Sequence, residues 1–160
     1  MPKIVLETNI TSDIVTVFNL SRSVALHELS TSKTNEKAVD GVTNGLLGLG
    51  DVVTWRARHL GVYQYLTVEI SKFKAPYFFE DRMVKGVFKS MNHQHYFYMK
   101  ENRVCMNDIF EYKAPLGILG KLADVLFLER YMHRFLEKRN KVIKEIAEDP
   151  KKVTQFLKPN

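Results

Sequence analysis

Two histidines and an aspartate in the second half of the chain are the side chains best placed to do chemistry, namely His93, His95 and Asp108. They fall in two stretches, 93–99 and 103–112, that alternate apolar and polar residues as β-strands do, with a two-residue turn at 101–102 between them. The predicted register pairs three sets of residues across this hairpin: His95 with Asp108, Phe97 with Met106, and His93 with Phe110.

The pair of His95 and Asp108 falls on the apolar face of the predicted hairpin, where ionisable side chains are uncommon. Asp108 could orient His95 so that its free nitrogen acts as a base or binds a polar group of a ligand. Equally, the two side chains could form a buried pair that only satisfies its own hydrogen bonds. Both interpretations stay open. The spacing of residues along the sequence places no nucleophile or oxyanion donor beside His95. We therefore assign no catalytic residue beyond the two candidates His95 and Asp108.

Metal binding is a third interpretation of the same histidines. His93 and His95 share one face of their strand, and His59 ends another predicted strand. Two strands lie between His59 and His93 in chain order, and neighbouring strands are about 4.8 Å apart. This separation disfavours a shared ion, so the sequence predicts no metal and no cofactor.

The element that must position these residues is a long helix predicted from residue 116 to about residue 148. Apolar residues recur there at steps of three and four, as on one face of an α-helix: Val125, Leu128, Met132, Phe135, Leu136, Val142, Ile143 and Ile146. A helix of about 30 residues is about 45 Å long and cannot bury its own apolar stripe. It therefore requires a wide sheet.

The preceding residues predict that sheet. The chain begins with a predicted strand at 3–9. Two short helices follow, one starting after Ser12-Asp13 and one over 24–29. Six antiparallel strands come next, at 36–42, 51–59, 62–73, 77–90, 93–99 and 103–112. A hairpin turn at Leu60-Gly61 pairs Trp55 with Leu66 on the inward face. A β-bulge is expected at 84–85, where the inward parity changes.

Composition limits the class of protein. With 160 residues, one cysteine and 26% charged residues, the chain is expected to be one soluble, cytoplasmic domain without disulfides. No apolar run is long enough for a transmembrane helix. The net charge of +6 is compatible with transient contact with an acidic membrane. Basic residues are interleaved with acidic ones, which favours a solvated surface over a nucleic-acid site.

Four motifs resemble the START-like (SRPBCC) superfamily, in particular its bacterial branch of small single-domain ligand-binding proteins. These motifs are Gly50–His59, Phe79–Phe88, His93–Phe97 and Met106–Gly117, and Leu122–Asp124 and Arg139–Asn140 continue the pattern. The resemblance implies an α+β helix-grip fold, in which a curved seven-stranded antiparallel sheet wraps the C-terminal helix. It implies a ligand-binding domain over residues 1–148, followed by a basic tail over 149–160.

The function implied by the resemblance is the binding of a small, mostly apolar molecule, such as a lipid, polyketide or aromatic compound, between sheet and helix. The alternative is an enzyme of the cyclase, aromatase or hydratase kind that uses His95 and Asp108. We expect a non-catalytic protein, a monomer or weak dimer, whose partner is a small hydrophobic molecule. The predicted ligand-binding residues are Trp55, His59, Leu66, Phe88, His93, His95, Phe97, Met106, Asp108, Phe110, Leu116, Met132 and Phe135.

Overall fold

The computed structural model describes residues 1–115 and 127–157. Its strands are β1 (Lys3–Ile10), β2 (Lys37–Gly41), β3 (Val52–His59), β4 (Val62–Lys74), β5 (Phe78–Lys85), β6 (Ser90–Lys100) and β7 (Arg103–Lys113). Its α-helices are α1 (Ile14–Ser21), α2 (Val24–Ser30), α4 (Glu129–Ala147) and α5 (Pro150–Phe156), and a 3₁₀ turn η1 covers Ser32–Thr34. The predicted α+β class is confirmed.

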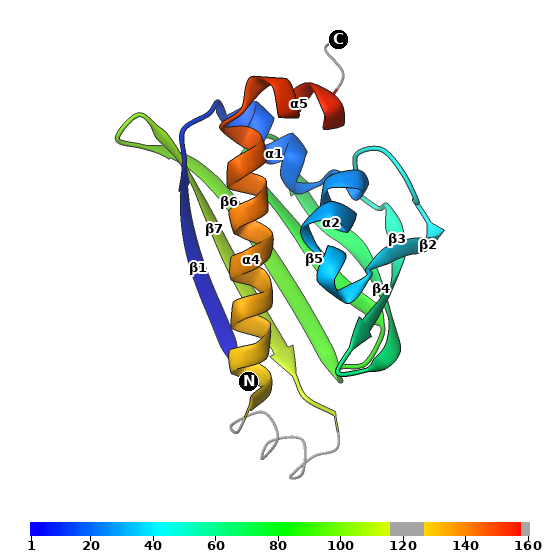
Figure 1. The fold of residues 1–160 in the computed structure, drawn as a ribbon. Coiled ribbons are helices and arrows are strands. Elements are labelled where there is room, and N and C mark those ends of the chain that lie inside the picture. The colour runs from blue at the N-terminus through cyan, green and yellow to red at the C-terminus, as the bar shows by residue number, and fades with distance from the viewer. Residues whose placement is uncertain (116–126, 158–160) are drawn as a thin grey trace.

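All seven strands form one antiparallel sheet in the order β1-β7-β6-β5-β4-β3-β2. Figure 1 shows α4 lying along one face of this sheet, with α1 and α2 beside it on the same face. The apolar stripe of α4 accounts for this placement, because Met132, Leu136, Ile143 and Ile146 are buried. Residues 116–126 of the predicted long helix, including Leu116, lie outside the described residues.

The two predicted hairpins have the predicted registers. Trp55 pairs with Leu66 across β3 and β4, and His95 pairs with Asp108 across β6 and β7. Both turns have two residues with positive φ, at 60–61 and at 101–102. Turns of this kind match the right-handed twist of the strands they join, so short turns fix the register. The inward position of Trp55 follows from that register, and this side chain is buried.

Strand β5 is shorter than the sequence predicted. It ends at Lys85, and residues 86–89 form a bend before β6 begins. The predicted irregularity is present, because the register with β4 shifts between Met83 and Lys85. Gly86 follows the end of the strand at a crowded position, since a Cβ there would lie 2.6 Å from the side chain of Leu66.

The segment predicted to be a basic tail contains helix α5. Asp149 caps this helix, its side chain accepting a hydrogen bond from the backbone N–H of Lys151, and Pro150 occupies the first turn. Val153, Phe156 and Leu157 pack against the main hydrophobic core. Residues 150–157 are therefore part of the packed structure.

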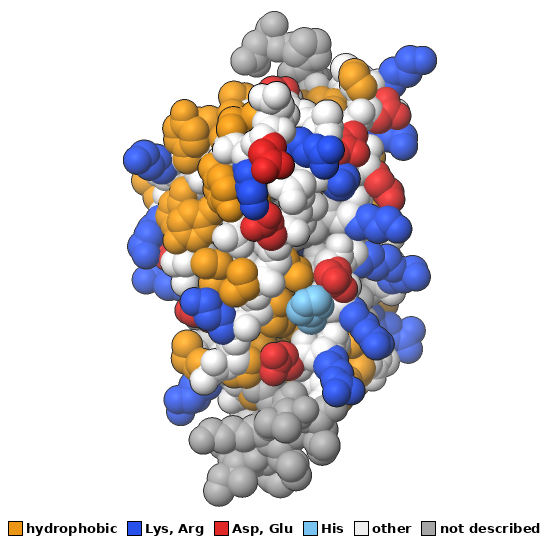
Figure 2. Space-filling model, turned by 90° about the vertical axis from the view of Figure 1, so that its left-hand side faces the viewer, with side chains coloured by type: hydrophobic (Ala, Val, Ile, Leu, Met, Phe, Trp, Pro, Cys, Tyr) orange, Lys and Arg blue, Asp and Glu red, His pale blue; other side chains and the backbone are white. Residues whose placement is uncertain are grey.

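Charged side chains are unevenly distributed on the face shown in Figure 2. Lysines and arginines lie along both edges and are most numerous on the right, with acidic residues among them, and hydrophobic side chains gather mainly on the left. Within residues 1–115 and 127–157, none of the helices has the length and apolarity that a membrane crossing requires.

Candidate functional site

Strands β6 and β7 place His95 and Asp108 side by side in the interior. The His95 side chain is 0% exposed and Asp108 is 1% exposed. Nδ1 of His95 lies 2.6 Å from Oδ1 of Asp108. This contact is an ion pair, and Nδ1 has no well-aligned hydrogen-bond partner among the described residues. The proximity predicted from the hairpin register is confirmed.

The second nitrogen of His95 meets another carboxylate, that of Asp81 on β5. Nε2 of His95 lies 2.9 Å from Oδ2 of Asp81. The sequence analysis did not assign Asp81 to the site, although this residue has the same inward parity as Phe79 on its strand. Its side chain is 19% exposed and lines the cavity described below. His95 is thus held between two carboxylates, one deeply buried and one at a cavity wall.

Asp108 also collects contacts from β6 and from α4. His93 places Nε2 at 3.1 Å from Oδ1 of Asp108. Asn140 donates a hydrogen bond of 2.6 Å to Oδ2, and Nη1 of Arg139 lies 3.7 Å from Oδ1. Arg139 also donates to the backbone carbonyl of Ser21. Both carboxylate oxygens therefore have partners, and the C-terminal half of α4 is tied to the sheet.

The charges in this cluster follow from these contacts. Burial alone would raise the pKa of Asp108, but the charge of His95 and the hydrogen bond with His93 hold this pKa well below its usual range. Burial acts to lower the pKa of His95, yet Asp108 and Asp81 together raise it. Burial and the neighbouring His95 charge lower the pKa of His93 to about 4. His95 is therefore favoured as a cation, and His93 is favoured as a neutral imidazole.

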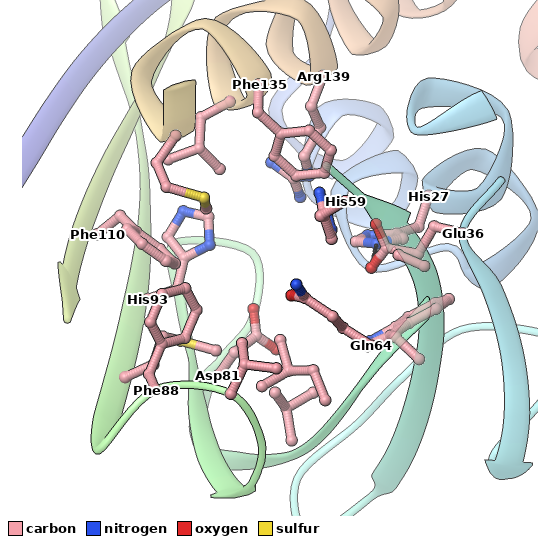
Figure 3. A pocket seen from close by; sticks show the side chains of 18 of the residues that line it. His27, Glu36, His59, Gln64, Asp81, Phe88, His93, Phe110, Phe135 and Arg139 are labelled. Carbon is pink, nitrogen blue, oxygen red and sulfur yellow. Dashed lines mark hydrogen bonds and ion pairs between the residues drawn. The ribbon is translucent and has the colours of Figure 1, made fainter. Parts of the chain in front are cut away.

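A cavity of about 270 Å³ lies between the sheet, α2 and α4. Figure 3 shows Asp81, His93 and Arg139 around it, with His27, Glu36 and His59 across the space from His93. Most of the wall is apolar: Leu47, Trp55, Leu66, Val68, Phe79, Val87, Phe88, Met91, Phe110, Leu128, Met132, Phe135 and Leu136. Such a site, mostly apolar with a few polar groups, is typical of small-molecule pockets.

A second polar group lies at this cavity, formed by His27, Glu36, His59 and Tyr131. Nε2 of His27 lies 3.1 Å from Oε1 of Glu36, and the His27 ring stacks on Trp55. Nδ1 of His59 and the Tyr131 hydroxyl share a hydrogen bond of 2.7 Å. Burial lowers the pKa of His59. Because His27 comes from α2 and Tyr131 from α4, no local sequence pattern indicated this cluster, and the sequence analysis proposed only His59.

Glu36 has one oxygen that its neighbours leave unused. The residue is 6% exposed and lines the cavity, and Oε2 is buried without a hydrogen-bond partner among the described residues. A buried carboxylate oxygen without a partner costs free energy. A hydrogen-bond donor on a bound molecule would remove this cost.

The cavity separates the predicted ligand-binding residues into two groups. The residues that line it are Trp55, His59, Leu66, Phe88, His93, Phe110, Met132 and Phe135. His95, Asp108, Phe97 and Met106 lie behind the wall, where Phe97 packs against Phe18 and Met106 contacts Ser21. Leu116 lies outside the described residues. Strand alternation placed the predicted strand residues of both groups inward, but it did not separate the cavity wall from the solid core.

Three solved structures have a similar fold over most of their length. The protein TTHA0849 from Thermus thermophilus has a TM-score of 0.75 and 15% identity, covering 96% of this chain and 98% of that one. Ginseng major latex-like protein 151 from Panax ginseng has a TM-score of 0.65 and 17% identity, covering 92% and 98%. KanY protein has a TM-score of 0.72 and 12% identity, covering 93% and 100%.

The chain has the helix-grip fold. The seven-stranded sheet around a C-terminal helix and these neighbours agree on that point. The fold that the START-like resemblance implies is therefore confirmed. No family model matches the chain, and no curated protein matches it in sequence. The helix-grip fold supports a ligand-binding architecture, and it leaves the ligand to be argued from the site.

Proposed function

We propose that the protein binds a small, mostly apolar molecule in the cavity between the sheet and α4. The observation that carries this proposal is an apolar cavity of about 270 Å³ with polar groups at two sides of its wall. A plain core would be filled at this point by side chains, because protein interiors are close-packed. On this proposal, apolar contact supplies most of the affinity, and the polar groups select among ligands.

The two polar groups define what the ligand should carry. Asp81 and Glu36 both present carboxylate oxygens to the cavity, and carboxylates accept hydrogen bonds when ionised. A hydroxyl, phenol or amine on an aromatic or alicyclic body would match them. A ligand whose only polar group is a carboxylate would be repelled by the carboxylates of Asp81 and Glu36, although Arg139 also lines the cavity.

The alternative function, a cyclase, aromatase or hydratase, needs His95 to present a free nitrogen to its substrate. Both ring nitrogens of His95 face carboxylates, and the side chain does not reach the cavity. A general base must lie within hydrogen-bond reach of the proton that it removes. This geometry favours ligand binding over base catalysis by His95.

A bulky substitution at the cavity wall tests the proposal. Met132 is buried on the inner face of α4, and Arg134 is exposed on the same helix. We expect Met132→Trp to weaken binding of the neutral fluorescent probe N-phenyl-1-naphthylamine at least tenfold, measured by fluorescence titration, because the new side chain fills the cavity. Arg134→Trp adds the same indole outside the cavity and should leave the affinity unchanged.

The fold of each variant is checked by circular dichroism, since overpacking costs about 1–3 kcal/mol. Wild-type protein that does not bind the probe, or equal losses in the two folded variants, would rule out probe binding in this cavity. Native mass spectrometry of protein purified from its host then identifies any small molecule that the protein retains.

A further inference from the structure

Asp81, His93 and His95 lie close enough together to share one ion. One ligand atom from each of these residues lies within 4.8 Å of the other two. Imidazole nitrogens and a carboxylate oxygen are donors that Zn²⁺ and related first-row metals accept. We propose that these three residues form a binding site for one divalent transition-metal ion at the cavity wall.

The third donor is Asp81 rather than His59. The sequence analysis predicted no metal site because two strands separate His59 from His93. In the sheet, β5 is the direct neighbour of β6, and Asp81 stands opposite His93. Neighbouring strands are close enough for their side chains to touch, so the Asp81 carboxylate lies next to the two histidines while His59 lies farther away.

Asp108 is placed as a supporting carboxylate for both histidines. Histidines that bind metals usually direct their other ring nitrogen to a carboxylate or carbonyl oxygen, which fixes the orientation of the ring. Oδ1 of Asp108 contacts Nδ1 of His95 at 2.6 Å and Nε2 of His93 at 3.1 Å. Nε2 of His95 then faces Asp81, and Nδ1 is the ring nitrogen of His93 that Asp108 does not contact.

The short contact between His95 and Asp81 requires a proton or a cation between the two side chains. Nε2 of His95 and Oδ2 of Asp81 are 2.9 Å apart, and both atoms carry lone pairs when the imidazole is neutral. In the metal-free protein, a proton on Nε2 joins them. A metal ion would take the place of this proton, and with metal–ligand bonds of about 2.0–2.2 Å the two donors need to separate only slightly.

Arg139 is the group that opposes a cation here, since it lines the same cavity. Its charge is directed partly to Asp108, at 3.7 Å, and to the carbonyl of Ser21. Asp81 and Asp108 carry two negative charges against the single charge of Arg139, so the neighbourhood still favours a cation. Because Asp81 and His93 line the cavity, three protein donors would leave the fourth coordination position open to a cavity ligand.

Cobalt titration tests the site directly. Protein freed of metal with a chelator is titrated with Co²⁺, whose visible absorption is strong in four- or five-coordinate sites. We expect one Co²⁺ per chain, displaced by Zn²⁺. Asp81→Asn and His93→Gln should each weaken Co²⁺ binding by more than about tenfold, the lower bound for loss of a supporting residue.

The matched control is His133→Gln. His133 lies on α4, is half exposed and contacts Glu137 rather than the cluster. This variant should bind Co²⁺ as the wild type does. Absence of the absorption in the wild type overturns the proposal. So does absorption that persists in Asp81→Asn, or absorption that His133→Gln abolishes.

A measurement on the wild-type chain decides the case in which the cluster variants do not fold. The ring ¹⁵N signals of the five histidines are recorded by NMR before and after addition of Zn²⁺. We expect the signals of His93 and His95 to shift and those of His27, His59 and His133 to stay. Shifts confined to the latter three histidines, or no shifts at all, overturn the proposal. Binding of the apolar probe to metal-free protein is independent of either result.

Discussion

Asp108 is the residue at which four buried polar side chains meet. Its two oxygens meet His93, His95, Arg139 and Asn140, which come from β6 and α4. A buried charge of this kind is tolerated only while its partners remain. The carboxylate therefore holds the sheet and the helix in one arrangement, whatever molecule the cavity contains.

Removal of this carboxylate should be costly. We expect Asp108→Ala to lower the free energy of unfolding by about 3–5 kcal/mol, because it leaves the charged His95 and Arg139 without their shared partner. Asp108→Asn keeps the shape and one acceptor and should cost less. Denaturant unfolding at neutral pH measures both. Asp40→Ala, at an exposed position, is the control and should change stability by less than about 0.5 kcal/mol. Equal stability of Asp108→Ala and Asp40→Ala would contradict this account.

Glu36 should select ligands that carry a donor. We expect 2-naphthol to displace the fluorescent probe at lower concentration than 2-methoxynaphthalene, which lacks the hydroxyl proton. Glu36→Met has a similar length without the acceptor, so this difference should shrink by about tenfold, on the scale of one hydrogen bond to a charged group. The affinity for 2-methoxynaphthalene serves as the internal control. A difference that survives in Glu36→Met would show that the donor binds elsewhere.

At the scale of elements, the β2–β3 connection depends on one glycine. Gly41 has φ +74°, and a Cβ there would lie 2.1 Å from the backbone oxygen of Val52. Gly45 in the same connection has φ +81° with no atom within 4 Å of such a Cβ. Both positions disfavour other residues, but only Gly41 also lacks space.

Alanine substitutions separate these two effects. We expect Gly45→Ala to lower the free energy of unfolding by about 1–2 kcal/mol, the cost of left-handed backbone for a residue with a Cβ. Gly41→Ala should cost more, because backbone atoms of β3 would have to move. Urea unfolding of the two variants gives the comparison. If Gly41→Ala costs no more than Gly45→Ala, the close approach to Val52 does not matter for stability.

The sequence predicted the elements better than the site, for a physical reason. Strand alternation and two-residue turns are local, so the Trp55–Leu66 and His95–Asp108 pairs could be predicted from spacing alone. Asp81 reaches His95 diagonally from the neighbouring strand β5, whose register with β6 no two-residue turn fixes. Arg139 arrives from a helix distant in the chain, and its contact depends on how the helix packs on the sheet. Helix α5 was missed although Asp149-Pro150 is a recognisable start signal.

For the whole molecule, the cavity implies that stability depends on the ligand. A molecule present at a hundred times its dissociation constant stabilises the native state by about 2.7 kcal/mol. For a chain of this size, this raises the melting temperature by about 5–10 °C. We expect N-phenyl-1-naphthylamine to produce such a shift in calorimetry. Met132→Trp, whose cavity is filled, should show none, and a similar shift in this variant would place the probe outside the cavity.

The two halves of α4 are attached to the rest of the molecule in different ways. Arg139 and Asn140 fix its C-terminal half to β7 and α1 through polar contacts, whereas the half nearer the cavity is held by apolar packing and by the Tyr131–His59 hydrogen bond. On the proposed function, we expect a ligand to pass between the first turns of α4 and β3, and we expect its residence time to depend on how often the Tyr131–His59 contact opens. Tyr131→Phe should shorten that time while leaving the Asp108 cluster untouched.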